Sequence, residues 1–233
     1  MSKKIVCMCI VACCVVFSLA AQQTGGQTEP ERTRTIEELY LSQNLELRLI
    51  RDQAASADWE DRSMAIQNLR AMQNEGRLTE SNSGAMIILE EMAKPIEQGG
   101  NTRNFNIIRR EAVNLLGDVG GKRSKQILME VLNLDRDSLV RAEAVYALGK
   151  IGIDERGEVL TQIMDTLHSE NVKPTPNDNF AYAVLLAIEK LAKSSGGLKA
   201  VDQLGPLNEL LRCNYKQEVK RKCKEVIYVL LQQ

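Results

Sequence analysis

The residue best suited to chemistry is the single histidine, His168, in the segment Asp165-Thr-Leu-His168-Ser169-Glu170. With Asp165 or a nearby serine, His168 could act as a general base. A polar helix end that faces water or contacts terminal carbonyl groups explains the same residues. Because the sequence has no second histidine and no nucleophile motif, we expect no catalytic role for His168 and no histidine-based metal site.

Only two of the six cysteines, Cys213 and Cys223, lie outside the first 14 residues. Cys213 lies beside an expected turn, and Cys223 lies about two helical turns along the next helix, roughly 11 Å away. A disulfide needs Cα atoms within about 7 Å of each other. We therefore expect free thiols, with Cys223 in a small buried position, and two cysteines alone do not make a metal site.

Acidic residues and glycine pairs are the remaining candidates for ligand binding. Asp135, Asp137, Asp154 and Glu155 lack the dense oxygen pattern of a calcium loop. We interpret Asp137 as a helix N-cap and Asp154 and Glu155 as first-turn acids. No glycine pair lies in a phosphate-binding motif, and we expect the glycines at 117 and 149–152 to mark helix ends. The sequence predicts a protein that is not an enzyme and has no metal and no cofactor.

Composition is that of an ordinary folded protein. The 233 residues include 30 Lys+Arg and 31 Asp+Glu, with 44% hydrophobic residues. This hydrophobic fraction is enough for a sizeable core. The near-neutral charge argues against a nucleic-acid partner, because nucleic-acid binders usually have a clear basic excess.

The N-terminal segment has the pattern of a secretory signal. Lys3 and Lys4 precede an apolar run that ends in small residues at Ala20 and Ala21. This pattern predicts a signal peptide over 1–21, followed by a flexible polar linker over 22–35. Two alternatives are a retained membrane anchor and a lipoprotein processed at Cys13, and only these would bring the chain into contact with a membrane. The expected location is outside the cytoplasm, either periplasmic or extracellular, or associated with the cell envelope.

From Ile36 onward the apolar residues recur at three- and four-residue spacing, and turn-forming residues interrupt them at short intervals. This pattern predicts ten helices in five pairs. The predicted ranges are 36–54, 58–75, 82–96, 104–118, 122–134, 138–152, 155–169, 178–194, 199–212 and 216–231.

The second helices resemble one another. Residues 141–148 (RAEAVYAL) match or resemble residues 109–116 (RREAVNLL) at six of eight positions, and residues 62–69 fit the same register. Helical pairs that recur every 30 to 47 residues are typical of a solenoid, in which each pair buries its apolar face against its neighbours. The predicted fold is all-α, a short right-handed α-solenoid of about five helical-hairpin repeats over 36–233.

The segment from Asp135 to Gly152 resembles a HEAT repeat of the bilin-lyase-like subtype. In that family an Asp in the inter-helix turn and an Arg six residues later brace neighbouring repeats, which implies that role for Asp135 and Arg141. Arg103 and Ser56 stand where two other bracing Asp residues would fall. The resemblance implies a protein-binding scaffold and no particular partner.

The second helices also supply the candidate contact residues, because in HEAT-like solenoids these helices line the concave side. In the repeat register they project a mixed polar stripe with two tyrosines, and tyrosine is enriched at protein interfaces. The candidate residues are Asn114, Tyr146, Lys150, Tyr182 and Lys190. The longer connections 97–103 and 169–179 and the basic run on the last helix are further candidates, although a polar last helix is expected at the end of any solenoid.

The function that these patterns favour is an exported, non-enzymatic scaffold that binds a protein partner in the cell envelope. One alternative is an accessory or lyase-like protein that acts on a modified protein substrate. Another is a membrane-tethered structural lipoprotein.

Overall fold

The computed structural model describes residue 36 and residues 44–94, 102–194 and 204–232. Residues 36–233 form one compact unit, and residues 1–35 belong to a separate unit. The predicted leader and linker lie outside the described residues, as do the Gly196-Gly197 pair and most of the connection 97–103.

The described residues form ten α-helices and no strand, which confirms the all-α prediction. Eight of the helices begin within three residues of a predicted start, and the other two, α3 and α11, follow residues outside the described part. The helices are α3 (Leu45–Ala55), α4 (Trp59–Asn74), α5 (Ser83–Ala93), α6 (Thr102–Val119), α7 (Gly121–Leu134), α8 (Ser138–Ile151), α9 (Glu158–Asn171), α10 (Asp178–Ser194), α11 (Gly205–Arg212) and α12 (Gln217–Leu231).

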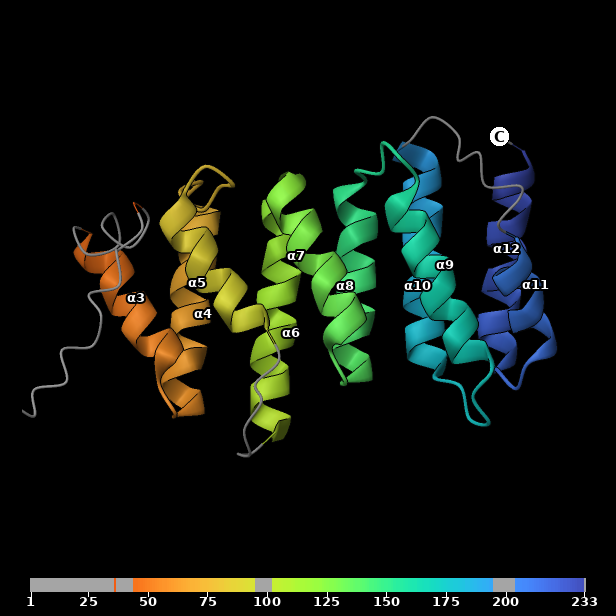
Figure 1. Cartoon of the computed structure of the whole chain (residues 1–233), viewed down its shortest axis with the longest axis horizontal. Helices are drawn as coiled ribbons and strands as arrows, with labels where there is room; N and C mark the ends of the chain where they lie inside the picture. The colour runs from red at the N-terminus through yellow and green to blue at the C-terminus, as the bar shows by residue number, and fades with distance from the viewer. Residues whose placement is uncertain (1–35, 37–43, 95–101, 195–203, 233) are drawn as a thin grey trace, which may run out of the picture. The chain divides into compact units, whose positions relative to one another are not determined.

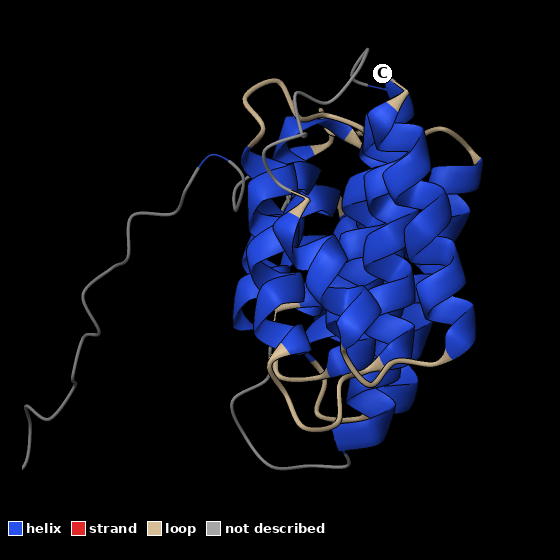
Figure 2. Cartoon of the chain, turned by 90° about the vertical axis from the view of Figure 1, so that its right-hand side faces the viewer, coloured by secondary structure: helices blue, strands red, loops and turns tan. Residues whose placement is uncertain are grey.

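Within the unit 36–233 the helices pair in order and stack as an α-solenoid (Figure 1). The second helices of the pairs, α4, α6, α8, α10 and α12, each pack against the next and form one continuous layer. The first helices α3, α5, α7, α9 and α11 form the other layer, in which α7 and α9 make few contacts. Loops gather at the two ends of the helices (Figure 2).

The core follows the repeat register. Ala65, Ala112 and Ala144 occupy equivalent positions of α4, α6 and α8 and are fully buried. Leu69, Leu116 and Leu148, each four residues after one of these alanines, are also buried. In α4, α6 and α8 a small and a large apolar residue therefore lie one helical turn apart in the buried core.

Two glycines have a different role from the predicted one. Gly117 and Gly149 lie inside α6 and α8 instead of at helix ends. A Cβ atom on Gly117 would lie 2.8 Å from the Cβ of Ala147, and one on Gly149 would lie 2.5 Å from the Cα of Ala187. Both glycines therefore allow close contact between successive second helices, whereas Gly152 is a true helix end with a left-handed φ of 68°.

Side-chain caps begin several helices. Asp137 accepts hydrogen bonds from the backbone N–H groups of Leu139 and Val140, which confirms it as the N-cap of α8. The prediction that Asp154 and Glu155 lie in the first turn of α9 is wrong, because that helix begins at Glu158. Asp154 precedes the helix, and its buried carboxylate accepts from the N–H groups of Val159 and Leu160 at 3.0 Å.

Candidate functional site

The exposed side of the second helices is the candidate partner-binding surface, and we call it the second-helix face. Its five predicted contact residues lie on α6, α8 and α10. They are Asn114, Tyr146, Lys150, Tyr182 and Lys190.

Polar side chains on this face bond across the repeats. The Asn114 Nδ2 atom donates to Glu143 Oε1 at 2.8 Å and joins α6 to α8. Lys150 of α8 forms an ion pair with Asp118 of α6. Arg70 of α4 also approaches Asp118, at 3.8 Å. Three successive second helices are therefore connected by polar contacts on their exposed side.

The two predicted tyrosines differ in their surroundings. The Lys190 Nζ atom lies 3.9 Å from the centre of the Tyr146 ring, so these two predicted residues meet as a cation–π pair between α10 and α8. Tyr182 is partly buried and packs against the hydrophobic core. Both tyrosines are therefore partly buried, and Lys190 covers one face of the Tyr146 ring.

Basic residues on α12 and at its N-cap form ion pairs with α10. Lys222 Nζ lies 2.6 Å from Glu189 Oε2 on α10, and Lys216 pairs with Asp178 at 3.3 Å. The hydrogen bond from Lys222 holds the pKa of the Glu189 carboxyl below its usual range. Sequence reasoning interpreted this run as a solvated end and missed the Glu189 pair, which only the packing of α12 on α10 reveals.

Polar and aromatic contacts at Arg109, Arg141 and Arg62 also join the repeats. The buried Asp135 accepts hydrogen bonds from Arg109 Nε at 3.0 Å and Nη2 at 2.9 Å, so the partner of Asp135 is the arginine of the preceding repeat. Arg141 donates to the carbonyl of Leu132 at 3.1 Å, and its guanidinium lies 5.0 Å from the centre of the Phe180 ring in the next repeat. Arg62 makes the same two kinds of contact, with Ser56 O and with the Phe105 ring.

His168 also takes part in a contact between repeats. Its Nδ1 atom lies 2.7 Å from Glu209 Oε2, which joins α9 to α11. This hydrogen bond is the main reason that the pKa of the Glu209 carboxyl falls below its usual range. The structure thus pairs His168 with Glu209, and neither Asp165 nor a serine is its partner.

Cys213 and Cys223 are free thiols in different environments. Cys223 is fully buried, its thiol donates to the carbonyl of Leu207, and burial raises its pKa to about 12. Cys213 is partly exposed and donates to the carbonyl of Asn171. The buried Tyr215 hydroxyl also bonds to Asn171, by donating to its Oδ1 atom at 3.0 Å.

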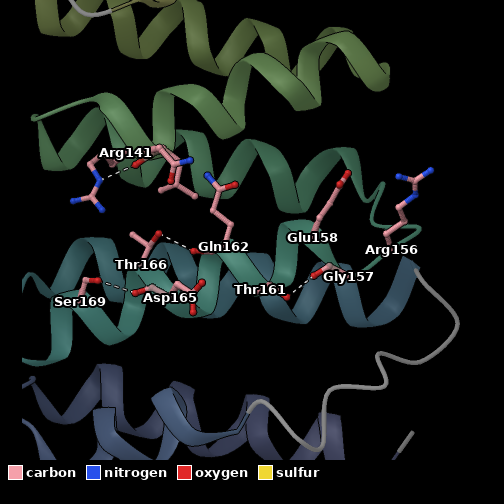
Figure 3. Close-up of a pocket in the computed structure, with 11 residues that line it drawn as sticks. Arg141, Arg156, Gly157, Glu158, Thr161, Gln162, Asp165, Thr166 and Ser169 are labelled. Atoms are coloured by element: carbon pink, nitrogen blue, oxygen red, sulfur yellow. Dashed lines mark hydrogen bonds between the residues drawn. The ribbon is translucent and has the colours of Figure 1, made fainter.

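A groove of about 640 Å³ lies on the first-helix layer, between α7 and α9 (Figure 3). Polar side chains line most of it, and Arg141 of α8 lies at one end. Gln162 crosses from α9 to α7 by donating to the carbonyl of Met129 at 2.8 Å. Among the residues that the structure describes, no three His, Cys, Asp or Glu side chains cluster as metal ligands would.

Comparison with known proteins finds a match to one family model, over about a third of the chain. The model for HEAT repeats matches residues 101–174, which span α6 to α9. No curated protein and no solved structure matches the chain. The matched segment contains the Asp135–Arg109 pair and the repeat motif of residues 135–152. Because the other helices of the described unit pair and stack in the same way, this unit is an all-α, HEAT-like solenoid. HEAT repeats generally serve as scaffolds for protein–protein interaction.

Within the described ranges, no helix combines the length and the apolar character needed to cross a bilayer.

Proposed function

We propose that this protein is an exported, non-enzymatic scaffold that binds a protein partner on its second-helix face. The observation that carries the proposal is the continuous layer of second helices, in which cross-repeat contacts hold the exposed side chains. Asn114, Tyr146, Lys150 and Lys190 each contact a neighbouring repeat. A surface whose side chains are already ordered loses less conformational entropy when a partner binds.

The leader supports the export half of the proposal. Residues 1–21 have a positively charged start, an apolar run and small residues at the expected cleavage site, which are typical of a cleaved signal peptide. Purification of the chain from the cells that express it, followed by N-terminal sequencing and intact mass, tests this directly. A mature N-terminus near Gln22 supports secretion, whereas a lipidated Cys13 or an intact leader supports membrane attachment.

The binding half of the proposal calls for affinity capture from envelope extract, with the full chain as bait. A Tyr146→Ala/Lys190→Ala variant removes the cation–π pair and leaves the buried core untouched. The matched control is Gln126→Ala/Glu130→Ala, two exposed residues of α7 on the other layer. We expect the native chain and the control to retain the same partner and the α8/α10 variant to lose it.

Two other outcomes would count against parts of this proposal. Equal capture by all three baits, with unchanged helical circular dichroism, would place the binding surface elsewhere. A coloured or small-molecule ligand that copurifies with the chain would favour the accessory or lyase-like alternative, which rests on the resemblance to the bilin-lyase-like subtype.

A further inference from the structure

Arg141 lacks the acidic partner that its equivalent has one repeat earlier. Arg109 and Arg141 lie three residues before Ala112 and Ala144, in the same repeat register. Arg109 is paired with Asp135 in the turn of the next repeat. In the following turn, the position equivalent to Asp135 is Thr175, which lies between two prolines. Residues 172–177 of that turn include no carboxylate, and the buried Glu170, whose carboxylate accepts from the Asn177 N–H group, pairs with Lys173 and not with Arg141.

Two contacts hold the Arg141 side chain and still leave donors unused. Its Nε atom donates to Leu132 O, and its guanidinium face lies over the Phe180 ring. Within the described part of the chain, no hydrogen-bond acceptor pairs with its two Nη groups. An arginine that is fixed by stacking and keeps a free edge is suited to bidentate recognition of a carboxylate.

The space in front of this edge is the groove between α7 and α9. Figure 3 shows Arg141 at one end of the groove, near Ser169, and Arg156 at the other end. The groove follows α9 from Gly157 to Ser169, a rise of roughly 18 Å. An extended chain of about five residues has that length.

The charges around the groove favour an acidic ligand. Glu158 is already paired with Lys125, whose hydrogen bond lowers the pKa of that carboxyl. Asp165 is then the one acidic lining residue without a described ion pair, against two arginines. The hydroxyl hydrogens of Thr166 and Ser169 are directed to helix carbonyls, so their oxygens can accept from a peptide backbone.

We propose that the groove between α7 and α9 binds an extended acidic segment of a protein, with one carboxylate on Arg141 and a second near Arg156. The ligand carboxylate would take the place that Asp135 has beside Arg109. This site lies on the first-helix layer and is separate from the second-helix face, so either proposal can fail while the other holds.

The proposal is tested by measuring peptide binding to the full chain, without an added N-terminal tag, by fluorescence anisotropy. The probe is a labelled, end-blocked peptide of five residues with glutamate at both ends and serine and alanine between. The comparison peptide has glutamine at both ends. We expect the glutamate peptide to bind at least about tenfold more tightly and to weaken as salt is added. Equal binding of the two peptides, or none of the acidic one, would overturn the proposal.

Variants in the groove locate the site. Arg141→Gln should weaken binding about tenfold, the loss of a charge-assisted hydrogen-bonded pair, and Arg156→Gln should weaken it less. Because Arg141 also contacts Phe180, Asp165→Asn provides a second test that leaves those contacts intact. It should strengthen binding about twofold to fivefold by removing a like charge. Arg51→Gln on α3 is the control and should change nothing.

The pattern of these results decides between an extended segment and a simple anion site. If the affinity is insensitive to both Arg141→Gln and Asp165→Asn, the groove is not the site and the proposal fails. If N-acetylglutamate competes as well as the five-residue peptide, a single carboxylate suffices and the extended segment is refuted.

Discussion

A substitution at Gly149 tests how closely the second helices pack. In a helix interior with room for a methyl group, replacing glycine by alanine stabilises a protein by about 0.5–1 kcal/mol. At Gly149 the new Cβ would lie 2.5 Å from the Cα of Ala187, 2.8 Å from its Cβ and 3.0 Å from its carbonyl oxygen. Carbon atoms in contact are normally about 3.5–4.0 Å apart, so α8 and α10 would have to separate by roughly 1 Å.

The clash is expected to exceed the helix-propensity gain. Overpacking of a well-packed core typically costs about 1–3 kcal/mol, and two of the three nearest atoms belong to backbone that cannot rotate away. We therefore expect Gly149→Ala to lower the free energy of unfolding by about 2 kcal/mol. Gly117→Ala should have a smaller effect of about 1 kcal/mol, because its closest neighbour is the Ala147 methyl group at 2.8 Å.

Urea unfolding followed by circular dichroism at 222 nm measures these effects. With a slope near 2 kcal/mol/M, Gly149→Ala should lower the midpoint by about 1 M. Gly205→Ala is the matched control, since no atom lies within 4 Å of the added methyl group and the residue begins α11. If Gly149→Ala is as stable as the wild type or more stable, the close approach of α8 and α10 is wrong.

Three further predictions concern contacts between repeats and the buried thiol. Asp135→Asn leaves a buried arginine without its anion and should destabilise the unit by about 3 kcal/mol in urea unfolding, and a cost below about 1 kcal/mol would contradict the buried pair. In the native state a maleimide reagent should label Cys213 and leave Cys223 unmodified until urea unfolds the chain, because burial raises the pKa of Cys223 to about 12 and blocks access. Since His168 lowers the pKa of Glu209, that carboxylate stabilises the fold above its ordinary pKa near 4.3 and stops doing so as the pH falls through the lowered value. Glu209→Gln should therefore cost a few tenths of a kcal/mol at pH 6 and progressively less as the pH is lowered below 4, and a loss that does not change with pH would exclude this origin.

The helices and their grouping into repeats were predictable from local sequence. Apolar spacing of three and four residues locates each helix, and the match of residues 109–116 to 141–148 reveals the repeat. A cap such as Asp137 was predictable for the same reason, because the bonds that it makes are only two and three residues away. These features depend on the chain near each residue and little on the packing between repeats.

Contacts between repeats were the part that local patterns did not reveal. A glycine near the end of an apolar run can either end its helix or allow a neighbouring helix to approach closely. Which of the two roles Gly149 has depends on where α10 packs. The partner of Asp135 lies 26 residues away, and the partner of His168 lies 41 residues away. Spacing between repeats varies, so no fixed offset identifies these pairs. Aligning Arg62, Arg109 and Arg141 in one register is the signal that could have found the arginine contacts.

The candidate contact residues illustrate the same limit. Their repeat register correctly places Asn114, Tyr146 and Lys150 on second helices. It does not show that Lys190 lies over Tyr146 or that Lys150 pairs with Asp118, because both contacts depend on the angle between neighbouring helices. Nor could it reveal the groove between α7 and α9, which exists because those two helices pack loosely while α8 packs tightly.

The most direct test of the scaffold account is the footprint of a captured partner. Hydrogen–deuterium exchange of the full chain, alone and with the partner recovered from envelope extract, maps the protected helices. Binding on the second-helix face predicts added protection in α6, α8 and α10, centred near Tyr146. Failure to recover any partner, or added protection confined to helices other than these, would contradict binding on the second-helix face.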